Sequence, residues 1–456
     1  MFTKLRLKNF KSFRDIEFNL LVNSNKPAPI AVIYGENGSG KSNLISAFSF
    51  LKNSLNTISF SGIAGKPIEE RKNSNYQLLV AESSVNNYGK PPDNLSLMAR
   101  KAMMIDTEDN MVLEFQFYLH DKPGVYEMEF DTNNRIVKER LQFLIKDRVG
   151  ALYEIEQSAD GSVTANFSSA FFANSDVRKV FLDGIEQYWG KHTFLAIYTN
   201  EALQKNTAYL SKSINNNFIV FHHHISSKMA VWCTGSENMF EFLSRSSEYF
   251  WPDGHVNKKD LHRLKAHETA LNTFFTRLYS DVKSVHYEYQ EKGDVLQYEL
   301  YFMKMIGDKI RRIPFSEEST GTKKILEIFP LLLECVKGGT ILIDEIDTGV
   351  HDMLMAFLVE DAVESFKGQF IVTTHNTILM EKLPPEAVFI IDIDSKGDKR
   401  IESIRDMYRG SGKKLQKNHN HQTRYESGFY GGAPFLQSVD LQDIADDLSS
   451  GEIARQ

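Results

Sequence analysis

The stretch that decides the fold reads Ile30-Ala31-Val32-Ile33-Tyr34-Gly35-Glu36-Asn37-Gly38-Ser39-Gly40-Lys41-Ser42. It opens with an unbroken apolar run, which is typical of a strand buried on both faces of a sheet. Apolar residues then recur at helical spacing from Leu44 to Leu55, so a helix is predicted directly after the glycine-rich turn. Strand, glycine-rich turn and helix in this order fit the P-loop pattern, whose backbone N–H groups converge on phosphate oxygens.

The polar groups of this turn match the parts of a nucleotide. Lys41 is expected to reach the β- and γ-phosphates, and the Ser42 hydroxyl is expected to ligate Mg²⁺. The helix points its positive dipole end at the same anion. The other expected nucleotide-binding positions in the turn are Gly35, Asn37, Gly38, Ser39 and Gly40. ATP and Mg²⁺ are therefore the predicted cofactors.

Two further apolar strands end in polar side chains. The strand 340–343 is followed by Asp344, which is expected to hold the magnesium shell, and by Glu345, which is expected to orient and activate the attacking water. The strand 370–373 leads to His375, which is expected to contact the γ-phosphate or that water. The candidate catalytic residues are thus Lys41, Glu345 and His375, and the candidate metal ligands are Ser42 and Asp344.

A second anion site is a hypothesis at the start of the helix predicted from Thr322 to Val336. Ser319 fits an ordinary N-cap there. Alternatively, its hydroxyl, the Gly321 N–H and the helix N-terminus form a site for a phosphate that another subunit brings.

These elements, in this order, resemble the ATP-binding-cassette (ABC) ATPase superfamily. The most similar branch is the soluble one that includes the RecF, SMC and Rad50 proteins and the overcoming-lysogenization-defect ATPases. Asn9-Phe10-Lys11-Ser12-Phe13 is similar to the N-terminal element of that branch, which implies that Lys11 lies near the nucleotide. Ser319-Thr320-Gly321 is similar to the signature motif, Asp347 to the loop that crosses the dimer interface, and His375 to the switch histidine. The resemblance implies a homodimer, or a larger homo-oligomer, whose heads enclose ATP head to tail.

The C-terminal stretch carries another resemblance. Arg424-Tyr425 through Tyr430-Gly431-Gly432-Ala433-Pro434 is similar to the ending of stand-alone ATPases of anti-phage systems, such as the ATPase subunits of PARIS and Septu. This likeness implies a sensor or regulatory ATPase of bacterial anti-phage defence that controls a separate effector protein, a nuclease. The family's switch glutamine is left open between Gln116 and Gln142.

The expected fold class is α/β: an ABC-ATPase head with an antiparallel β meander and a mostly parallel P-loop sheet, plus an inserted helical lid or short arm. The expected division of the chain is an ATPase core at 1–56 and 285–440, an irregular insertion and meander at 57–170, a helical insertion at 171–284 and a polar tail at 441–456. The individual predictions include meander strands at 113–119, 125–130 and 136–144, irregular chain at 57–105, and a helix from Lys259 to Val285.

Composition narrows the class of protein. The 456 residues carry a formal net charge of -7, so a nucleic-acid surface would have to be local. Two cysteines argue against a disulfide framework, and no apolar run approaches the roughly 20 residues needed to cross a bilayer. We therefore expect a cytoplasmic protein with no membrane partner. A local basic patch for DNA or RNA is a hypothesis for Lys309, Arg311, Arg312, Arg409, Lys413, Lys414 and Lys417.

Two weaker patterns receive structural interpretations. Phe221-His222-His223-His224 is read as a strand, on which adjacent side chains point to opposite faces and do not readily bind one metal ion. Asp392-Ile393-Asp394 is read as a strand end and turn instead of a nuclease site.

Three functions remain open from the sequence. The first is the defence ATPase that controls an effector. The second is a DNA-binding ATPase clamp of DNA repair, similar to RecF and Rad50. The third is a nucleotide-gated scaffold with little turnover.

Overall fold

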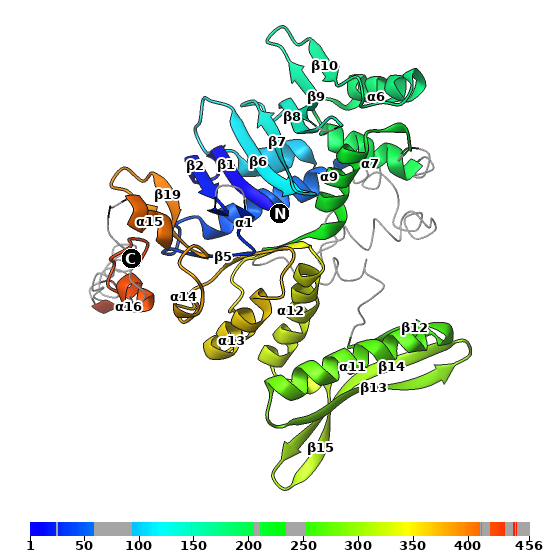
Figure 1. Ribbon diagram of the computed structural model, residues 1–456, viewed down its shortest axis with the longest axis vertical. Helices are drawn as coiled ribbons and strands as arrows, with labels where there is room; N and C mark the ends of the chain where they lie inside the picture. The colour runs from blue at the N-terminus through cyan, green and yellow to red at the C-terminus, as the bar shows by residue number, and fades with distance from the viewer. Residues whose placement is uncertain are drawn as a thin grey trace, which may run out of the picture.

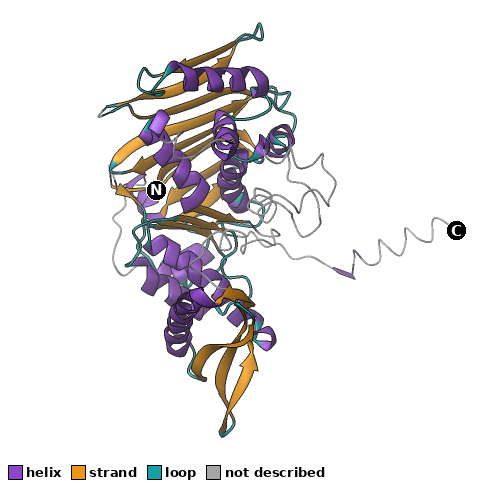
Figure 2. Cartoon of the chain, turned by 90° about the vertical axis from the view of Figure 1, so that its right-hand side faces the viewer, coloured by secondary structure: helices purple, strands orange, loops and turns teal. Residues whose placement is uncertain are grey.

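The computed structural model describes residues 1–23, 26–58, 94–146, 148–204, 210, 212–233, 252–410, 412, 420–433, 441–442 and 444. Their elements form an upper antiparallel sheet, a central and mostly parallel sheet, and a lower lobe (Figure 1). Seen from the side, helices pack against one face of the upper sheet and lie below the central sheet (Figure 2).

The upper sheet has seven strands in the order β10-β9-β8-β7-β6-β1-β2, all antiparallel. Their bounds are β1 Phe2–Phe10, β2 Phe13–Asn19, β6 Met111–Leu119, β7 Lys122–Phe130, β8 Ile136–Leu144, β9 Val149–Gln157 and β10 Val163–Phe167. In β6 every second residue is buried, as the period of a half-exposed strand requires. The predicted three-strand meander is confirmed, and β9 and β10 extend it.

The central sheet has six strands in the order β11-β16-β17-β5-β18-β19. Their bounds are β5 Ile30–Tyr34, β11 Met229–Trp232, β16 Thr340–Ile343, β17 Gln369–Thr373, β18 Val388–Ile393 and β19 Lys399–Ser403. Only β19 runs antiparallel to its neighbour. Every residue of β5 is buried, because layers cover both faces of this sheet. The predicted α/β class, an antiparallel meander with a mostly parallel P-loop sheet, is confirmed.

Helix α1 (Lys41–Ser54) lies between the two sheets, where the Phe48 ring packs 5.5 Å from that of Phe115. The opposite face of the central sheet carries α12, α13 and α14 (Figure 1). The remaining bounds are β3 Leu21–Asn23, β4 Lys26–Pro27, α5 Leu95–Ala102, α6 Ser175–Tyr188, α7 Phe194–Gln204, α9 Asn216–His223, α12 Thr320–Val336, α13 Asp352–Val363, α14 Leu379–Lys382, α15 Ile404–Gly410 and α16 His421–Glu426. No helix in the described part of the chain combines the length and apolar character that a bilayer span requires.

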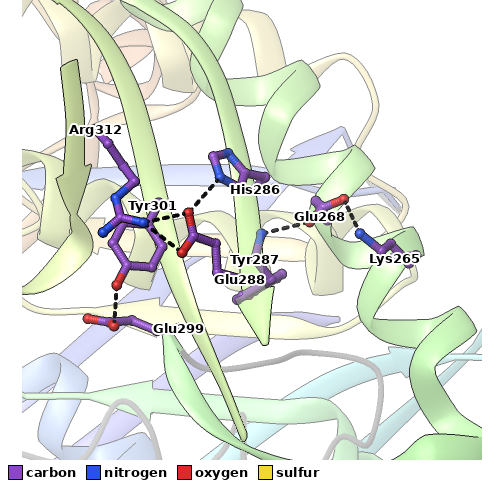
Figure 3. Close-up of polar contacts among 8 residues, drawn as sticks. All are labelled: Lys265, Glu268, His286, Tyr287, Glu288, Glu299, Tyr301 and Arg312. Atoms are coloured by element: carbon purple, nitrogen blue, oxygen red, sulfur yellow. Dashed lines mark hydrogen bonds and ion pairs between the residues drawn. The ribbon is translucent and has the colours of Figure 1, made fainter. Parts of the chain in front are cut away.

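The lower lobe packs α11 (Leu261–Leu278) on a four-stranded sheet. Its strands are β12 Asp253–Asn257, β13 Val282–Lys292, β14 Val295–Ile306 and β15 Lys309–Pro314. On the sheet, Arg312 bonds both carboxylate oxygens of Glu288, at 3.0 and 2.8 Å, and lies over the Tyr301 ring (Figure 3).

The basic patch predicted from the sequence is not one surface. Arg409 belongs to α15, which lies beside the central sheet, whereas Lys309, Arg311 and Arg312 belong to β15 at the bottom of the lower lobe (Figure 1). Arg312 is also paired with Glu288. Lys413, Lys414 and Lys417 lie outside the described residues. The four described bases therefore do not form the single patch that was predicted, because residues about 100 positions apart fold onto separate elements. The part of the prediction that concerns Lys413, Lys414 and Lys417 stays a prediction.

Three element predictions need correction. Phe221 to His223 end helix α9 and His224 begins a π-helical turn, so the strand reading of this stretch was wrong. His222 and His224 bond different threonines, Thr199 at 2.8 Å and Thr340 at 3.1 Å. Irregular chain was predicted at 57–105, but Leu95–Ala102 is a helix with Asn94 as its N-cap, and 59–93 lie outside the described residues. The helix predicted from Lys259 ends at Leu278, because β13 begins at Val282.

Candidate nucleotide site

The turn between β5 and α1 has the backbone that a phosphate cradle needs. Gly38 and Gly40 have φ angles of 82° and 107°, a region in which only glycine is unstrained. A Cβ atom on Gly40 would lie 2.6 Å from the Phe13 ring, so this position also lacks space for a side chain. A Cβ atom on Gly38 would meet nothing within 4 Å. The turn is therefore packed against the Phe13 ring at Gly40 and open at Gly38.

Lys41 lies at the base of this turn, at the N-terminus of α1. Its Nζ donates to the carbonyl oxygens of Gly35 at 2.7 Å and Glu36 at 3.1 Å. Burial lowers the pKa of Lys41, and nearby carboxylates, Asp344 foremost, oppose that shift. The Ser39 hydroxyl is buried and has no hydrogen-bond partner among the described residues, whereas Asn37 and Ser42 are exposed. These groups fit a phosphate, which would accept from N–H and hydroxyl donors that the protein leaves available.

A threonine holds the two predicted acids together. The Thr373 hydroxyl, at the end of β17, donates to Asp344 Oδ1 at 2.6 Å and accepts from the Glu345 N–H at 2.8 Å. Glu345 has a φ of 53°, a strained value for a residue with a side chain. Since β17 lies between β16 and β5, the acids are two strand spacings, or about 10 Å, from the strand that leads to the P-loop.

The loop after the acids and the segment after β17 are joined to each other and to β5. The His375 N–H donates to Asp347 Oδ2 at 3.2 Å, and the His375 side chain is exposed. The next residue, Asn376, accepts a 2.8 Å hydrogen bond at its carbonyl from the Tyr34 hydroxyl. Tyr34 is the last residue of β5. This hydrogen bond therefore links the residue before the P-loop to the neighbour of the predicted switch histidine.

The N-terminal element lies against the P-loop. Burial lowers the pKa of Lys11, and Cys233 and Asp344 act in the opposite direction. The Ser12 hydroxyl accepts from Lys399 Nζ at 2.9 Å, and the same ammonium donates to the Gly38 carbonyl at 2.9 Å. A base from β19 thus joins the N-terminal element to the phosphate turn.

Ser319 caps α12, as its ordinary reading predicted: its Oγ accepts from the Thr322 N–H at 3.1 Å. Gly321 lies against the loop after Glu345, since a Cβ atom on it would be 3.1 Å from the Gly349 carbonyl. Within the described chain, no hydrogen bond or ion pair joins Ser319 or Gly321 to residues 35–42. The Ser319 side chain is exposed. The second anion site, formed by Ser319 and Gly321, therefore stays a prediction.

A protein family described as "AAA domain, putative AbiEii toxin, Type IV TA system" matches residues 30–95 and 105–381. The chain belongs to this family. The match covers the P-loop, both acids and His375. It leaves out the N-terminal element and everything after residue 381.

Three solved structures are similar to this AAA protein. The SMC head bound to the C-winged helix domain of ScpA is 15% identical with a TM-score of 0.45, over 90% of this chain and 99% of that chain. The SMC head domain from Thermotoga maritima is 16% identical with a TM-score of 0.37, over 88% and 98%. The Smc head domain with an extended coiled coil, bound to the C-terminal domain of ScpA from Pyrococcus furiosus, is 16% identical with a TM-score of 0.35, over 90% and 98%. No curated protein matches the chain.

The donor set of the AAA protein suits Mg²⁺. The described residues contain no group of three or more His, Cys, Asp or Glu side chains that would bind a metal ion by themselves. Mg²⁺ does not need such a group, because it keeps several waters and is held by one or two protein oxygens together with phosphates. The Ser42 hydroxyl and the Asp344 carboxylate would supply those oxygens.

Sequence reasoning missed several residues of this site, among them Tyr34, Thr373 and Lys399. Thr373 and Tyr34 end apolar strands, and a polar atom at such a strand end indicates a candidate site residue. Lys399 had no local signal. The switch glutamine also stays a prediction: Gln116 bonds Glu114 at 2.8 Å and Gln142 lies on β8, both in the upper sheet.

Proposed function

We propose that this AAA protein binds ATP with Mg²⁺ at residues 35–42 and hydrolyses it. The observation that carries the proposal is the Thr373 hydroxyl. It ends β17, the strand next to the one that leads to the P-loop, and it bonds both Asp344 and the Glu345 backbone at the end of the strand beyond. Acids at this position suit a magnesium ligand and a group that orients water. An ordinary surface acid would not require a buried partner of this kind.

Each residue then has a stated task. The turn's N–H groups and Lys41 hold the β- and γ-phosphates, and Ser42 and Asp344 hold the metal, which when bound neutralises charge that develops on the phosphates. Glu345 orients the attacking water and accepts its proton. His375, whose N–H donates to Asp347 Oδ2, contacts the γ-phosphate or that water. Lys11 adds positive charge from the N-terminal element.

We further propose that two copies enclose two ATP molecules head to tail. Support comes from the exposed Ser319 side chain, for which the described residues show no hydrogen bond to residues 35–42, and from Gly321, which lies beside Gly349 in the loop that carries Asp347. The γ-phosphate bridges the two copies, so ATP favours the closed dimer and hydrolysis favours the open state.

A mixing experiment tests the shared site. Lys41→Ala removes the phosphate lysine, and Ser319→Arg blocks the signature. Each variant alone should lack turnover, whereas an equal mixture contains mixed dimers with one intact composite site and should recover part of the wild-type rate. A mixture as inactive as its components would contradict head-to-tail sharing.

The biological role proposed is regulation of a separate effector, a nuclease, in cytoplasmic anti-phage defence. The family description, which names a toxin of a type IV TA system, and the C-terminal resemblance to stand-alone defence ATPases support it. Phage protection should require both this chain and the neighbouring open reading frame. Protection by the chain alone would contradict the proposal of a separate effector. Toxicity of the chain alone would assign the toxic activity to this protein.

The two alternative functions have their own tests. For a DNA clamp, the ATP-bound protein should bind duplex DNA with an affinity that falls steeply with salt. Arg409 and the bases of β15 do not form one basic surface, so the predicted basic patch no longer supports the DNA clamp. For a nucleotide-gated scaffold, ATP should bind without measurable steady-state turnover.

A further inference from the structure

The C-terminal segment, residues 420–433, lies against the nucleotide site although it is outside the family match. Its helix α16 carries Tyr425, which is 7% exposed. The Tyr425 ring packs 5.7 Å from that of Tyr34, the last residue before the P-loop. Burial raises the pKa of the Tyr425 phenol, and the Gly35 backbone N–H partly offsets the rise.

The same segment also bonds the chain after the switch histidine. Glu426 Oε1 accepts from the Thr377 hydroxyl at 3.2 Å, and the Gln422 N–H donates to Glu381 Oε1 at 2.7 Å. Thr377 is two residues beyond His375. One short segment therefore contacts both the P-loop side and the histidine side of the site.

Two glycines fix the segment on the central sheet. Gly431 and Gly432 have φ angles of 72° and 65°, and a Cβ atom on Gly432 would lie 2.6 Å from the Ile391 carbonyl. That carbonyl belongs to β18, the strand beside β5. The Tyr425 hydroxyl donates to the Gly432 carbonyl at 2.9 Å and closes the segment on itself. Because the segment is close-packed against the sheet, a shift of the segment would displace the residues that it contacts.

We propose that the C-terminal segment sets the position of the P-loop relative to the His375 segment, with Tyr425 and Glu426 as positioning residues. This inference rests on the proposed ATPase function. Tyr34 is the link, because its ring contacts Tyr425 while its hydroxyl bonds the Asn376 carbonyl at 2.8 Å. Tyr425 acts on the phosphate cradle and so on ATP affinity. Glu426 acts on the histidine side and so on turnover.

The experiment uses the full chain and three readouts: the Kd for ATP with Mg²⁺, the kcat and KM of hydrolysis, and the nucleotide-free melting temperature. Tyr425→Ala should raise the Kd about 10-fold, the size of effect expected of a residue that acts through packed neighbours. Glu426→Ala should lower kcat about 5-fold with little change in KM. Glu426→Gln keeps an oxygen acceptor for Thr377 and should restore kcat.

Phe429→Ala is the matched control. Phe429 lies on the same segment, is 50% exposed, and its ring contacts Tyr408, Tyr430 and the Arg424 guanidinium. It should leave Kd and kcat unchanged. An equal rise in the Kd for ATP in Phe429→Ala and Tyr425→Ala would mean that the effect does not depend on the contact between Tyr425 and Tyr34. That result would overturn the inference.

Tyr425→Phe covers the case in which Tyr425→Ala fails to fold. The phenyl ring stays against Tyr34, but the bond to the Gly432 carbonyl is lost, and the Kd should rise about 3-fold. An unchanged Kd in a folded Tyr425 variant would overturn the inference and leave the ATPase proposal intact. A wild-type chain that does not bind ATP would overturn both.

Discussion

Thr373→Val is the substitution that probes the site most selectively. Valine has nearly the shape of threonine but no hydroxyl, so the side chain still fills its position in β17. The change removes the donor to Asp344 at 2.6 Å and the acceptor of the Glu345 N–H at 2.8 Å. Thr373 is 0% exposed, so water has no access to replace the hydroxyl.

The expected magnitude follows from these two bonds. A hydrogen bond to a charged group contributes about 1.5–3 kcal/mol, and a buried N–H left without a partner costs about 1–3 kcal/mol. We expect the unfolding free energy to fall by about 3 kcal/mol, less than the sum of the two contributions, because both hydrogen bonds belong to one hydroxyl and are not independent. Turnover should fall about 100-fold, because displacements of order 1 Å in a reacting constellation have effects of that size.

The assay is phosphate release at saturating ATP with Mg²⁺, together with the melting temperature. Thr373→Ser keeps the hydroxyl and should retain most of the wild-type kcat. Thr374→Val is the matched control, since Thr374 is 1% exposed and its hydroxyl accepts the Asn376 N–H at 2.9 Å instead of bonding the acids. The reasoning is refuted if Thr373→Val turns over ATP within about 3-fold of Thr373→Ser.

Three further predictions concern stability. Burial raises the pKa of Glu139 from 4.5 to about 7, so the folded chain keeps a proton that the unfolded chain loses, and the unfolding free energy should fall by about 3 kcal/mol as pH rises from 4.5 to 7. Gly40→Ala should abolish the rise in melting temperature caused by ATP, because its Cβ would lie 2.6 Å from the Phe13 ring. Lys304→Met should cost about 3–5 kcal/mol in urea unfolding, since it leaves the Glu318 carboxylate, whose side chain is 3% exposed, without its 2.7 Å partner.

Each of these has a control. Glu139→Gln should flatten the pH dependence of unfolding, and an unchanged slope would point to another group. Gly161→Ala has a comparable φ of 87° and open space, so it should leave the ATP response intact. Lys323→Met removes a half-buried lysine whose Nζ donates to the carbonyl of the exposed Ser316 at 2.6 Å, and it should cost little. Equal losses for Lys323→Met and Lys304→Met would contradict the importance of the buried partner.

Residues close in sequence were the ones that could be predicted. The P-loop was readable because its strand, turn and helix are contiguous, and the strands of residues 340–343 and 370–373 were readable from unbroken apolar runs. The central acids follow such a strand directly. Their meeting with the P-loop could be expected because parallel strands bring their carboxyl ends to one edge of a sheet.

Contacts between distant segments could not be predicted in this way. Lys399 reaches the Gly38 carbonyl from a strand 361 positions away, and no local pattern distinguishes it from a solvated lysine. The strand Met229–Trp232 is short, so helix and strand were not separable there. The C-terminal segment was noticed as a motif, but its position against Tyr34 depends on the whole sheet.

The central claim is that residues 35–42 hold a triphosphate while Asp344 and Glu345 manage its metal and water. Titration of ATP with Mg²⁺ into wild type, Lys41→Ala and Glu345→Gln, followed by single-turnover hydrolysis, tests it most directly. We expect that wild type and Glu345→Gln bind ATP, that Lys41→Ala does not, and that only wild type releases phosphate at an appreciable rate. Normal phosphate release by Glu345→Gln, or equal ATP affinity in Lys41→Ala, would contradict it.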